Sequence, residues 1–170
     1  MESRIRSVSR LLPFGVTVVW DALTDPVLLQ GWLAPEVRPL VGQTLAIALD
    51  AVPLPGASAA IMRSIEPGRA AELDLGAAGT VRFEVVEAEP FASGRGASTC
   101  TATASPAHDL ADRGLVAALD ARLDALHELL RGRPVDWVAA SPGDVTLPGV
   151  QDRDTGVPGD GRAPWRGTDG

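Results

Sequence analysis

The stretch at residues 18–35, VVWDALTDPVLLQGWLAP, places Trp20 and Trp32 on either side of a Thr-Asp-Pro step. The apolar residues before the step recur at the spacing of one helix face: Val16, Val19, Trp20 and Leu23. After it, Thr24 or Asp25 can cap a second short helix, in which Pro26 occupies the first turn. We therefore expect two short helices whose tryptophans pack in the core, an interpretation favoured over stacking on a ligand.

From residue 36 onward, apolar and polar residues alternate. Val81 and Phe83, for instance, flank Arg82. Such alternation is typical of antiparallel strands with one buried and one solvated face. Strands are expected, between turns rich in Gly and Pro, at residues 36–40, 43–50, 57–65, 70–76, 79–88 and 96–105, after a first strand within residues 3–12.

Residues 110–131 predict the longest helix, with one apolar side made of leucines: Leu115, Leu119, Leu123, Leu126 and Leu130. Gly132 and Pro134 end it. Residues 138–170 are rich in Gly, Pro and Asp and have no apolar periodicity, which predicts a disordered tail behind one domain at residues 1–137.

The order of these elements predicts an α+β fold. One strand, two short helices, an antiparallel meander and a long amphipathic helix form the helix-grip fold, in which the sheet wraps the C-terminal helix. A cavity can remain between the sheet and that helix.

The opening stretch also carries a resemblance to a family. Together with VEAEP at 86–90, ALDARLDALHELLRG at 118–132 and RPVDW at 133–137, it resembles the START-like (SRPBCC) superfamily. Within it, the sequence is most similar to bacterial homologues of the C-terminal domain of the activator of heat shock protein 90 ATPase. The resemblance covers residues 4–137 and implies the helix-grip, Bet v-like fold.

The resemblance implies a protein that binds a small hydrophobic or amphipathic ligand in the cavity. A co-chaperone-like protein-interaction domain is the alternative, and a cyclase- or hydrolase-type enzyme using the same cavity is a further one. Two departures change the cavity wall. Leu119 stands where bacterial members usually have Trp, and GRGAST at 94–99 replaces a Gly-Thr hairpin signature.

The residues expected to line the cavity come from the inward faces of the strands and from the long helix. They are Leu45, Ile47, Ile61, Arg63, Leu73, Phe83, Cys100, Leu119 and Leu123. Arg63 leaves two alternatives open. If its strand face is buried, the guanidinium needs an acid or an anionic ligand. If the register shifts by one residue, Arg63 is exposed.

Residues that could carry chemistry are few. His108 and Asp109 are adjacent, but neighbouring side chains rarely point at one another, and Asp109 fits a helix cap. His127 falls on the polar face of the long helix. Cys100 fits a small buried residue, because only His108 could activate it as a nucleophile. We therefore assign no catalytic residue, metal or cofactor, and favour binding over catalysis.

The amino-acid composition limits the classes of partner that the protein can have. With 170 residues, 45% hydrophobic residues and a net charge of -7, the chain fits one acidic domain and does not favour a nucleic-acid partner. The only cysteine is Cys100, which fits a reducing cytoplasm. Since no apolar run approaches the ~20 residues of a membrane helix, we expect a cytoplasmic, bacterial protein without membrane insertion. Its partner is a small apolar or amphipathic molecule or, in the alternative, a protein.

Overall fold

Seven antiparallel strands form one sheet in the order β1-β7-β6-β5-β4-β3-β2. The computed structural model describes residues 5–50, 52, 54–90, 94, 96–107 and 114–140. In chain order the elements are β1 (Arg6–Leu12), α1 (Val16–Thr24), α2 (Pro26–Gln30), β2 (Glu36–Pro39), β3 (Thr44–Ala48), β4 (Ala59–Glu66), β5 (Ala70–Asp74), the 3-10 turn η1 (Gly76–Ala78), β6 (Gly79–Ala88), β7 (Ala97–Pro106), α4 (Leu115–Leu130) and α5 (Trp137–Ala140).

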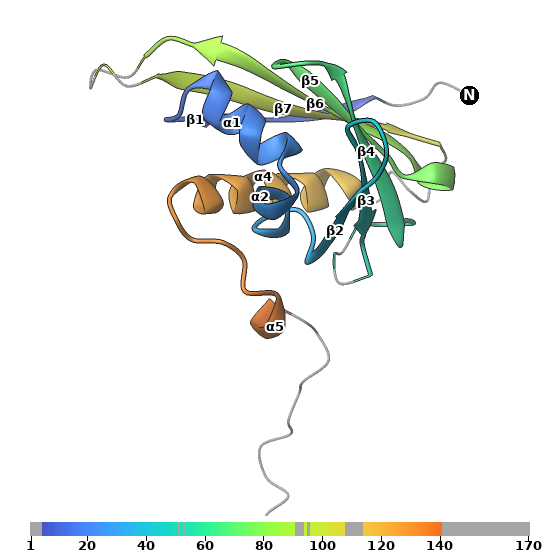
Figure 1. Ribbon diagram of the computed structural model, residues 1–170. Helices are drawn as coiled ribbons and strands as arrows, with labels where there is room; N and C mark the ends of the chain where they lie inside the picture. Colours follow the sequence, from blue (N-terminus) through green and yellow to red (C-terminus); the bar gives the residue numbers. More distant parts are fainter. Residues whose placement is uncertain are drawn as a thin grey trace, which may run out of the picture.

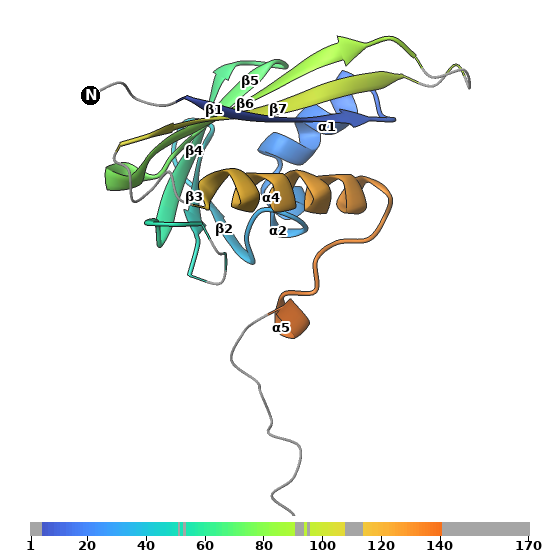
Figure 2. The ribbon, with the colours of Figure 1, turned by 180° about the vertical axis from the view of Figure 1, so that it is seen from behind.

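The sheet bends around α4. Strands β1, β7 and β6 lie along one side of the helix, while β4, β3 and β2 turn past its N-terminal end (Figures 1 and 2). The two short helices cover the same concave face, and α1 packs on β6 and β7. This is the helix-grip arrangement that the sequence predicted, with the meander from β2 to β7 closed by the pairing of β1 with β7.

The two short helices form as expected. The Asp25 carboxylate caps α2, since its Oδ1 accepts hydrogen bonds from the backbone N–H groups of Val27 (2.8 Å) and Leu28 (3.1 Å). Trp32 is fully buried and meets Phe83 edge to face, with ring centroids 5.8 Å apart. Trp32 therefore belongs to the core, whereas Trp20 is only partly buried.

The long helix α4 buries its leucines and ends at a glycine. Gly132 has φ +81°, and its N–H donates to the carbonyl of Leu129 (2.8 Å) while the N–H of Arg133 donates to that of Glu128 (2.9 Å). These two bonds make a Schellman cap, which satisfies carbonyls at the helix end. The expected first turn of this helix, before residue 114, lies outside the described residues.

The chain then runs back over α2. The Trp137 indole Nε1–H donates to the carbonyl of Gln30 (2.6 Å), and the N–H of Val135 donates to that of Gly31 (2.8 Å). Of the segment expected to be a disordered tail, residues 138–140 belong to α5, and residues 141–170 lie outside the described residues.

Strand register decides the alternatives that were open for Arg63. In β4, Ala60 and Met62 are buried on the concave face, so Ile61 and Arg63 point to the outer face. There Arg63 forms an ion pair with Asp74 of β5 (2.9 Å). Arg63 therefore has an exposed position and a carboxylate partner, and it is not a buried cation.

Candidate functional site: a pocket between α1 and the β3–β4 hairpin

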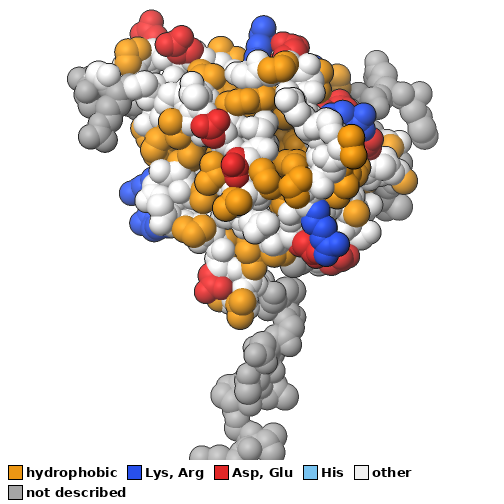
Figure 3. All heavy atoms as spheres, viewed as in Figure 1, with side chains coloured by type: hydrophobic (Ala, Val, Ile, Leu, Met, Phe, Trp, Pro, Cys, Tyr) orange, Lys and Arg blue, Asp and Glu red, His pale blue; other side chains and the backbone are white. Residues whose placement is uncertain are grey.

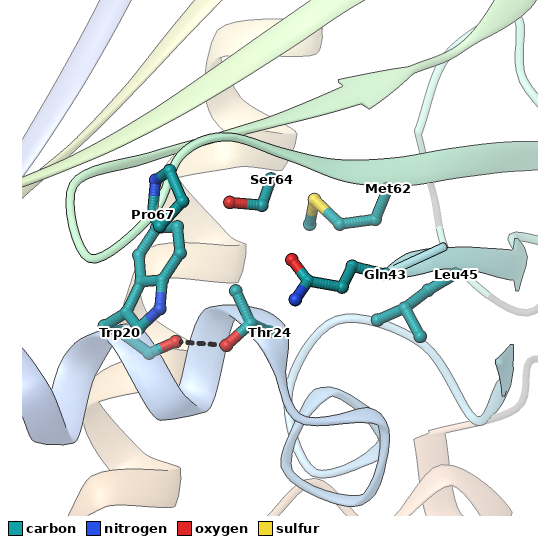
Figure 4. A pocket seen from close by; sticks show the side chains of 7 residues that line it. All are labelled: Trp20, Thr24, Gln43, Leu45, Met62, Ser64 and Pro67. Atoms are coloured by element: carbon teal, nitrogen blue, oxygen red, sulfur yellow. Dashed lines mark hydrogen bonds between the residues drawn. The ribbon is translucent and has the colours of Figure 1, made fainter. Parts of the chain in front are cut away.

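The described residues enclose a pocket of about 350 Å³ between the C-terminal half of α1 and the concave face of β3 and β4 (Figure 4). Its lining residues come from α1, the β2–β3 turn, β3, β4 and the β4–β5 turn. They are Trp20, Thr24, Gln43, Leu45, Met62, Ser64 and Pro67. No residue of α4 is among them, so this pocket lies beside α1 and not between the sheet and the long helix.

The pocket wall combines apolar surface with uncharged polar groups. Trp20, Leu45, Met62 and Pro67 supply the apolar part, while the other three lining side chains are two hydroxyls and an amide. The Thr24 hydroxyl donates its proton to the backbone carbonyl of Trp20 (2.9 Å), which leaves it able only to accept a further hydrogen bond. The face that carries α1 and α2 shows hydrophobic side chains over much of its middle (Figure 3).

The turn before β3 places Gln43. Gly42 and Gln43 have consecutive positive φ values, +72° and +53°, as the tight turn of a β-hairpin requires. The N–H of Leu40 donates to the carbonyl of Thr44 (2.8 Å) and closes the turn. In Figure 4 the Gln43 amide extends between Thr24 and Met62, into the pocket.

The end of β4 places Ser64. Its Oγ is buried and has no hydrogen-bond partner among the described residues. Between Ser64 and Glu66 the pairing of β4 with β5 shifts, which marks a β-bulge immediately after the last inward side chain. An unsatisfied buried hydroxyl is costly, so it indicates a group that a bound molecule or a water can satisfy.

The structure brings one of the sequence-predicted cavity residues to this pocket, namely Leu45. Six others lie in the packed core and are at most 2% exposed: Ile47, Leu73, Phe83, Cys100, Leu119 and Leu123. Ile61 and Arg63 lie on the outer face, where Ile61 lines a second hollow of about 280 Å³ over β2, β3 and β4. Burial raises the pKa of the Cys100 thiol to about 12, so the thiol stays protonated at neutral pH.

Several lining residues were missed by sequence reasoning: Thr24, Gln43, Met62, Ser64 and Pro67. For Met62 and Ser64 the sequence did contain a signal, the two-residue alternation of β4, which places them on the same strand face as Ala60. The alternation allowed either face of β4 to be inward, and the choice depends on pairing with β3 and β5. The role of Gln43 depends on turn geometry, which the Gly-Gln pair only suggests.

The remaining candidates form no second site among the described residues. His108 and Asp109 lie outside the described residues, and His127 is half-buried on α4. Within the described part of the chain, no cluster of three or more His, Cys, Asp or Glu side chains could hold a metal ion. None of the helices described here has the length and hydropathy needed to span a bilayer.

Comparison with known proteins gives similarity in fold. No known family's sequence model matches the chain, and no curated protein is a significant match. Protein MLL2253 from Mesorhizobium loti superposes with a TM-score of 0.57 at 18% identity, covering 78% of this chain and 100% of that one. The Aha1 dimer from Colwellia psychrerythraea gives 0.55 at 14% identity, covering 75% and 96%.

A third structure is DynU16, described as a putative protein in the dynemicin biosynthetic locus. It gives a TM-score of 0.57 at 18% identity, and the match covers 79% of this chain but 49% of DynU16. Identities this low establish a shared fold and no shared activity. The chain thus has the helix-grip fold, which it shares with these proteins.

Proposed function

We propose that the protein binds a small, uncharged amphipathic molecule in the pocket between α1 and the β3–β4 hairpin. The observation that carries this is the pocket itself, about 350 Å³ with four apolar and three neutral polar lining side chains. Small-molecule sites in proteins are typically ~300–1,000 Å³ hollows of this composition, in which a few polar groups set the orientation of the ligand.

The lining favours a neutral ligand. Burying a charged group costs several kcal/mol unless an opposite charge or several hydrogen bonds compensate it. The seven lining side chains of this pocket carry no charge. The same composition favours binding over a cyclase or hydrolase reaction, because acid–base catalysis needs a titratable group within reach of the substrate.

Native mass spectrometry of the protein purified from its own host tests the proposal. Met62→Trp fills the pocket, and Ile61→Trp is the matched control, since residue 61 points to the outer face. We expect a stoichiometric small molecule in the wild type and in Ile61→Trp, and its loss in Met62→Trp. Leu45→Phe is a milder filling variant should Met62→Trp fold poorly.

The opposite pattern would contradict the proposal. If the molecule survives Met62→Trp and is lost in Ile61→Trp, it occupies the outer hollow that Ile61 lines. If a well-folded wild type carries no molecule and its thermal midpoint is unchanged across a panel of neutral lipids and aromatic compounds, the pocket is not a ligand site.

A co-chaperone-like protein-interaction role is the second candidate. The observation that favours it is the β2–β3 turn, where Leu40 and Val41 are 48% and 97% exposed. Exposed apolar side chains next to each other are more common at interaction sites than on inert surface. The ATPase rate of heat shock protein 90, with the wild type and with a Leu40→Ser, Val41→Ser variant, tests this role. An unchanged rate with both proteins rules out ATPase activation.

A further inference from the structure

Gln43 occupies a backbone conformation that its residue type disfavours. Its φ of +53° lies in the left-handed region, where a Cβ crowds the following carbonyl. Tight hairpin turns usually place Gly, Asn or Asp at such positions. Gln43 is the only described residue other than glycine with a positive φ. Non-glycine residues held this way are concentrated at binding sites, so the question is what the side chain does.

The Gln43 residue is exposed, its side chain extends into the pocket in Figure 4, and its amide has no hydrogen-bond partner among the described residues. Figure 4 shows the amide between Thr24 and Met62, below Ser64, and no hydrogen bond joins it to another residue drawn. A primary amide offers a carbonyl acceptor and N–H donors side by side. The nearby Ser64 hydroxyl also lacks a partner among the described residues. The polar groups that a ligand would meet are thus the amide edge of Gln43 and the hydroxyls of Ser64 and Thr24, of which Thr24 can only accept.

We propose that Gln43 is the specificity-determining residue of this pocket, and that its ligand is a neutral, planar molecule with a hydrogen-bond donor and an acceptor on adjacent atoms, as in a lactam. This inference rests on the proposed function. The lactam edge is complementary to the amide edge of Gln43, so two hydrogen bonds form at once, as when Gln pairs with the edge of adenine. A carboxylate has no donor for the amide carbonyl and loses its hydration in an uncharged wall.

The pocket volume sets the size of the ligand. An apolar cavity of about 150 Å³ accepts benzene. The pocket here is about 350 Å³, more than twice that volume, which accommodates two fused rings. The ring faces would contact the apolar wall formed by Trp20, Leu45 and Met62 while the polar edge meets Gln43.

Four two-ring probes of nearly equal shape test the proposal. 2-Quinolone carries the lactam, coumarin has the acceptor alone, naphthalene has neither group, and 2-naphthoate is charged. Binding is followed through the indole N–H signals in NMR, because Trp20 lines the pocket whereas the Trp32 N–H is bonded to the carbonyl of Ala22. We expect 2-quinolone to bind about ten-fold or more tightly than naphthalene, with coumarin between them and 2-naphthoate weakest.

Two variants test whether Gln43 causes the preference for 2-quinolone over naphthalene. Gln43→Met keeps the length of the side chain and removes the amide, so 2-quinolone and naphthalene should bind within about two-fold of each other while naphthalene keeps its affinity. Gln43→Gly relieves the left-handed backbone, so it should raise the thermal midpoint and also abolish the preference. Gln30→Met is the matched control, because the Gln30 amide donates to the carbonyl of Val37 outside the pocket.

The outcomes separate this inference from the proposed function. If 2-quinolone and naphthalene both shift the Trp20 signal in the wild type with equal affinity, or if Gln43→Met keeps the preference, the pocket binds ligands but Gln43 does not select them. If no probe shifts the Trp20 signal in the folded protein, the pocket does not accept small neutral rings, and both proposals fail.

Discussion

The indole Nε1–H of Trp32 donates a 2.8 Å hydrogen bond to the backbone carbonyl of Ala22. In a continuous helix this carbonyl would accept from the N–H four residues later, but that residue is Pro26, which has none. Trp32 therefore supplies the donor that the proline removes. The bond joins α1 to the segment after α2 and explains why the stretch needs a tryptophan at this position.

Trp32→Phe is expected to destabilise the protein. The carbonyl of Ala22 would be left buried and unpaired, which costs about 1–3 kcal/mol, and the smaller ring would leave a cavity beside Phe83. Urea unfolding followed by far-UV circular dichroism measures the loss. Trp20→Phe is the control: residue 20 is only partly buried, so its effect should be well below that of Trp32→Phe. Equal losses would contradict the role given to this hydrogen bond.

The cap at Asp25 gives a second prediction. Asp25→Ala removes the acceptor of the Val27 and Leu28 N–H groups and should lower the free energy of unfolding by about 1 kcal/mol. Asp25→Asn keeps a side-chain oxygen acceptor, so most of the stability should remain. Chemical denaturation of the wild type, Asp25→Ala and Asp25→Asn distinguishes a capping hydrogen bond from a purely electrostatic effect. If the effect is purely electrostatic, Asp25→Asn should lose as much stability as Asp25→Ala.

Arg10 holds the edge strand β1 to α4, since its guanidinium donates to Asp124 (2.8 Å) and Asp120 (2.6 Å). The hydrogen bond to Asp124 first, and that to Asp120, raise the pKa of Arg10 above its ordinary value. A basic group whose pKa is raised by folding stabilises the folded state at every pH below its ordinary titration range. It loses this stabilising effect only at pH values above that range. Salt, and not pH, is therefore the useful variable near neutrality.

Arg10→Met should lower the free energy of unfolding by up to about 1 kcal/mol at low ionic strength, and by less in 1 M NaCl, because these side chains are partly exposed and screened. Arg38→Met is the control, since the Arg38–Glu36 pair lies on the surface of a short edge strand. An Arg10→Met loss that is independent of salt would point to lost packing and not to lost charge.

The buried thiol of Cys100 is expected to lower the free energy of unfolding at alkaline pH. Burial raises the pKa of its thiol from 9.0 to about 12. Between these values the unfolded chain has lost the thiol proton and the folded chain still holds it, so stability falls as pH rises from 9 toward 12. At pH 10.5 the loss is roughly 2 kcal/mol.

The composition makes this measurement clean, because the chain has no tyrosine and no lysine to titrate in the same range. Urea unfolding at pH 8 and pH 10.5 should show a larger drop for the wild type than for Cys100→Ala, which lacks the thiol. Identical drops in the two proteins would show that the thiol is not the group responsible.

Local signals predicted the secondary structure closely. Helix-face spacing around Trp20, the Asp-Pro step at residue 25 and the two-residue alternation of the strands all recur as observed elements. These patterns are local because hydrogen bonds within a helix and the faces of a strand involve residues close in sequence. The expected strand at 43–50 is shorter in the structure, at Thr44–Ala48, since strand ends depend on the neighbouring strand.

The site itself was only partly predictable. Leu45 was expected in a cavity and lines one, but the cavity lies beside α1. The sequence could not show that Trp32 and Phe83 would fill the space near α4, because that packing joins segments 51 residues apart. Nor could it show that Arg63 faces outward to Asp74.

The sequence by itself determined the order of elements, the helix-grip fold and a cap at Thr24 or Asp25, because short-range periodicity and turn chemistry carry that information; the structure assigns the cap to Asp25. Only the tertiary structure decided which face of β4 is inward, and so brought Met62 and Ser64 together with Gln43 and Trp20. The physical reason is that a shift of one residue in pairing moves every side chain of a strand to the other face, and that pairing is a long-range contact.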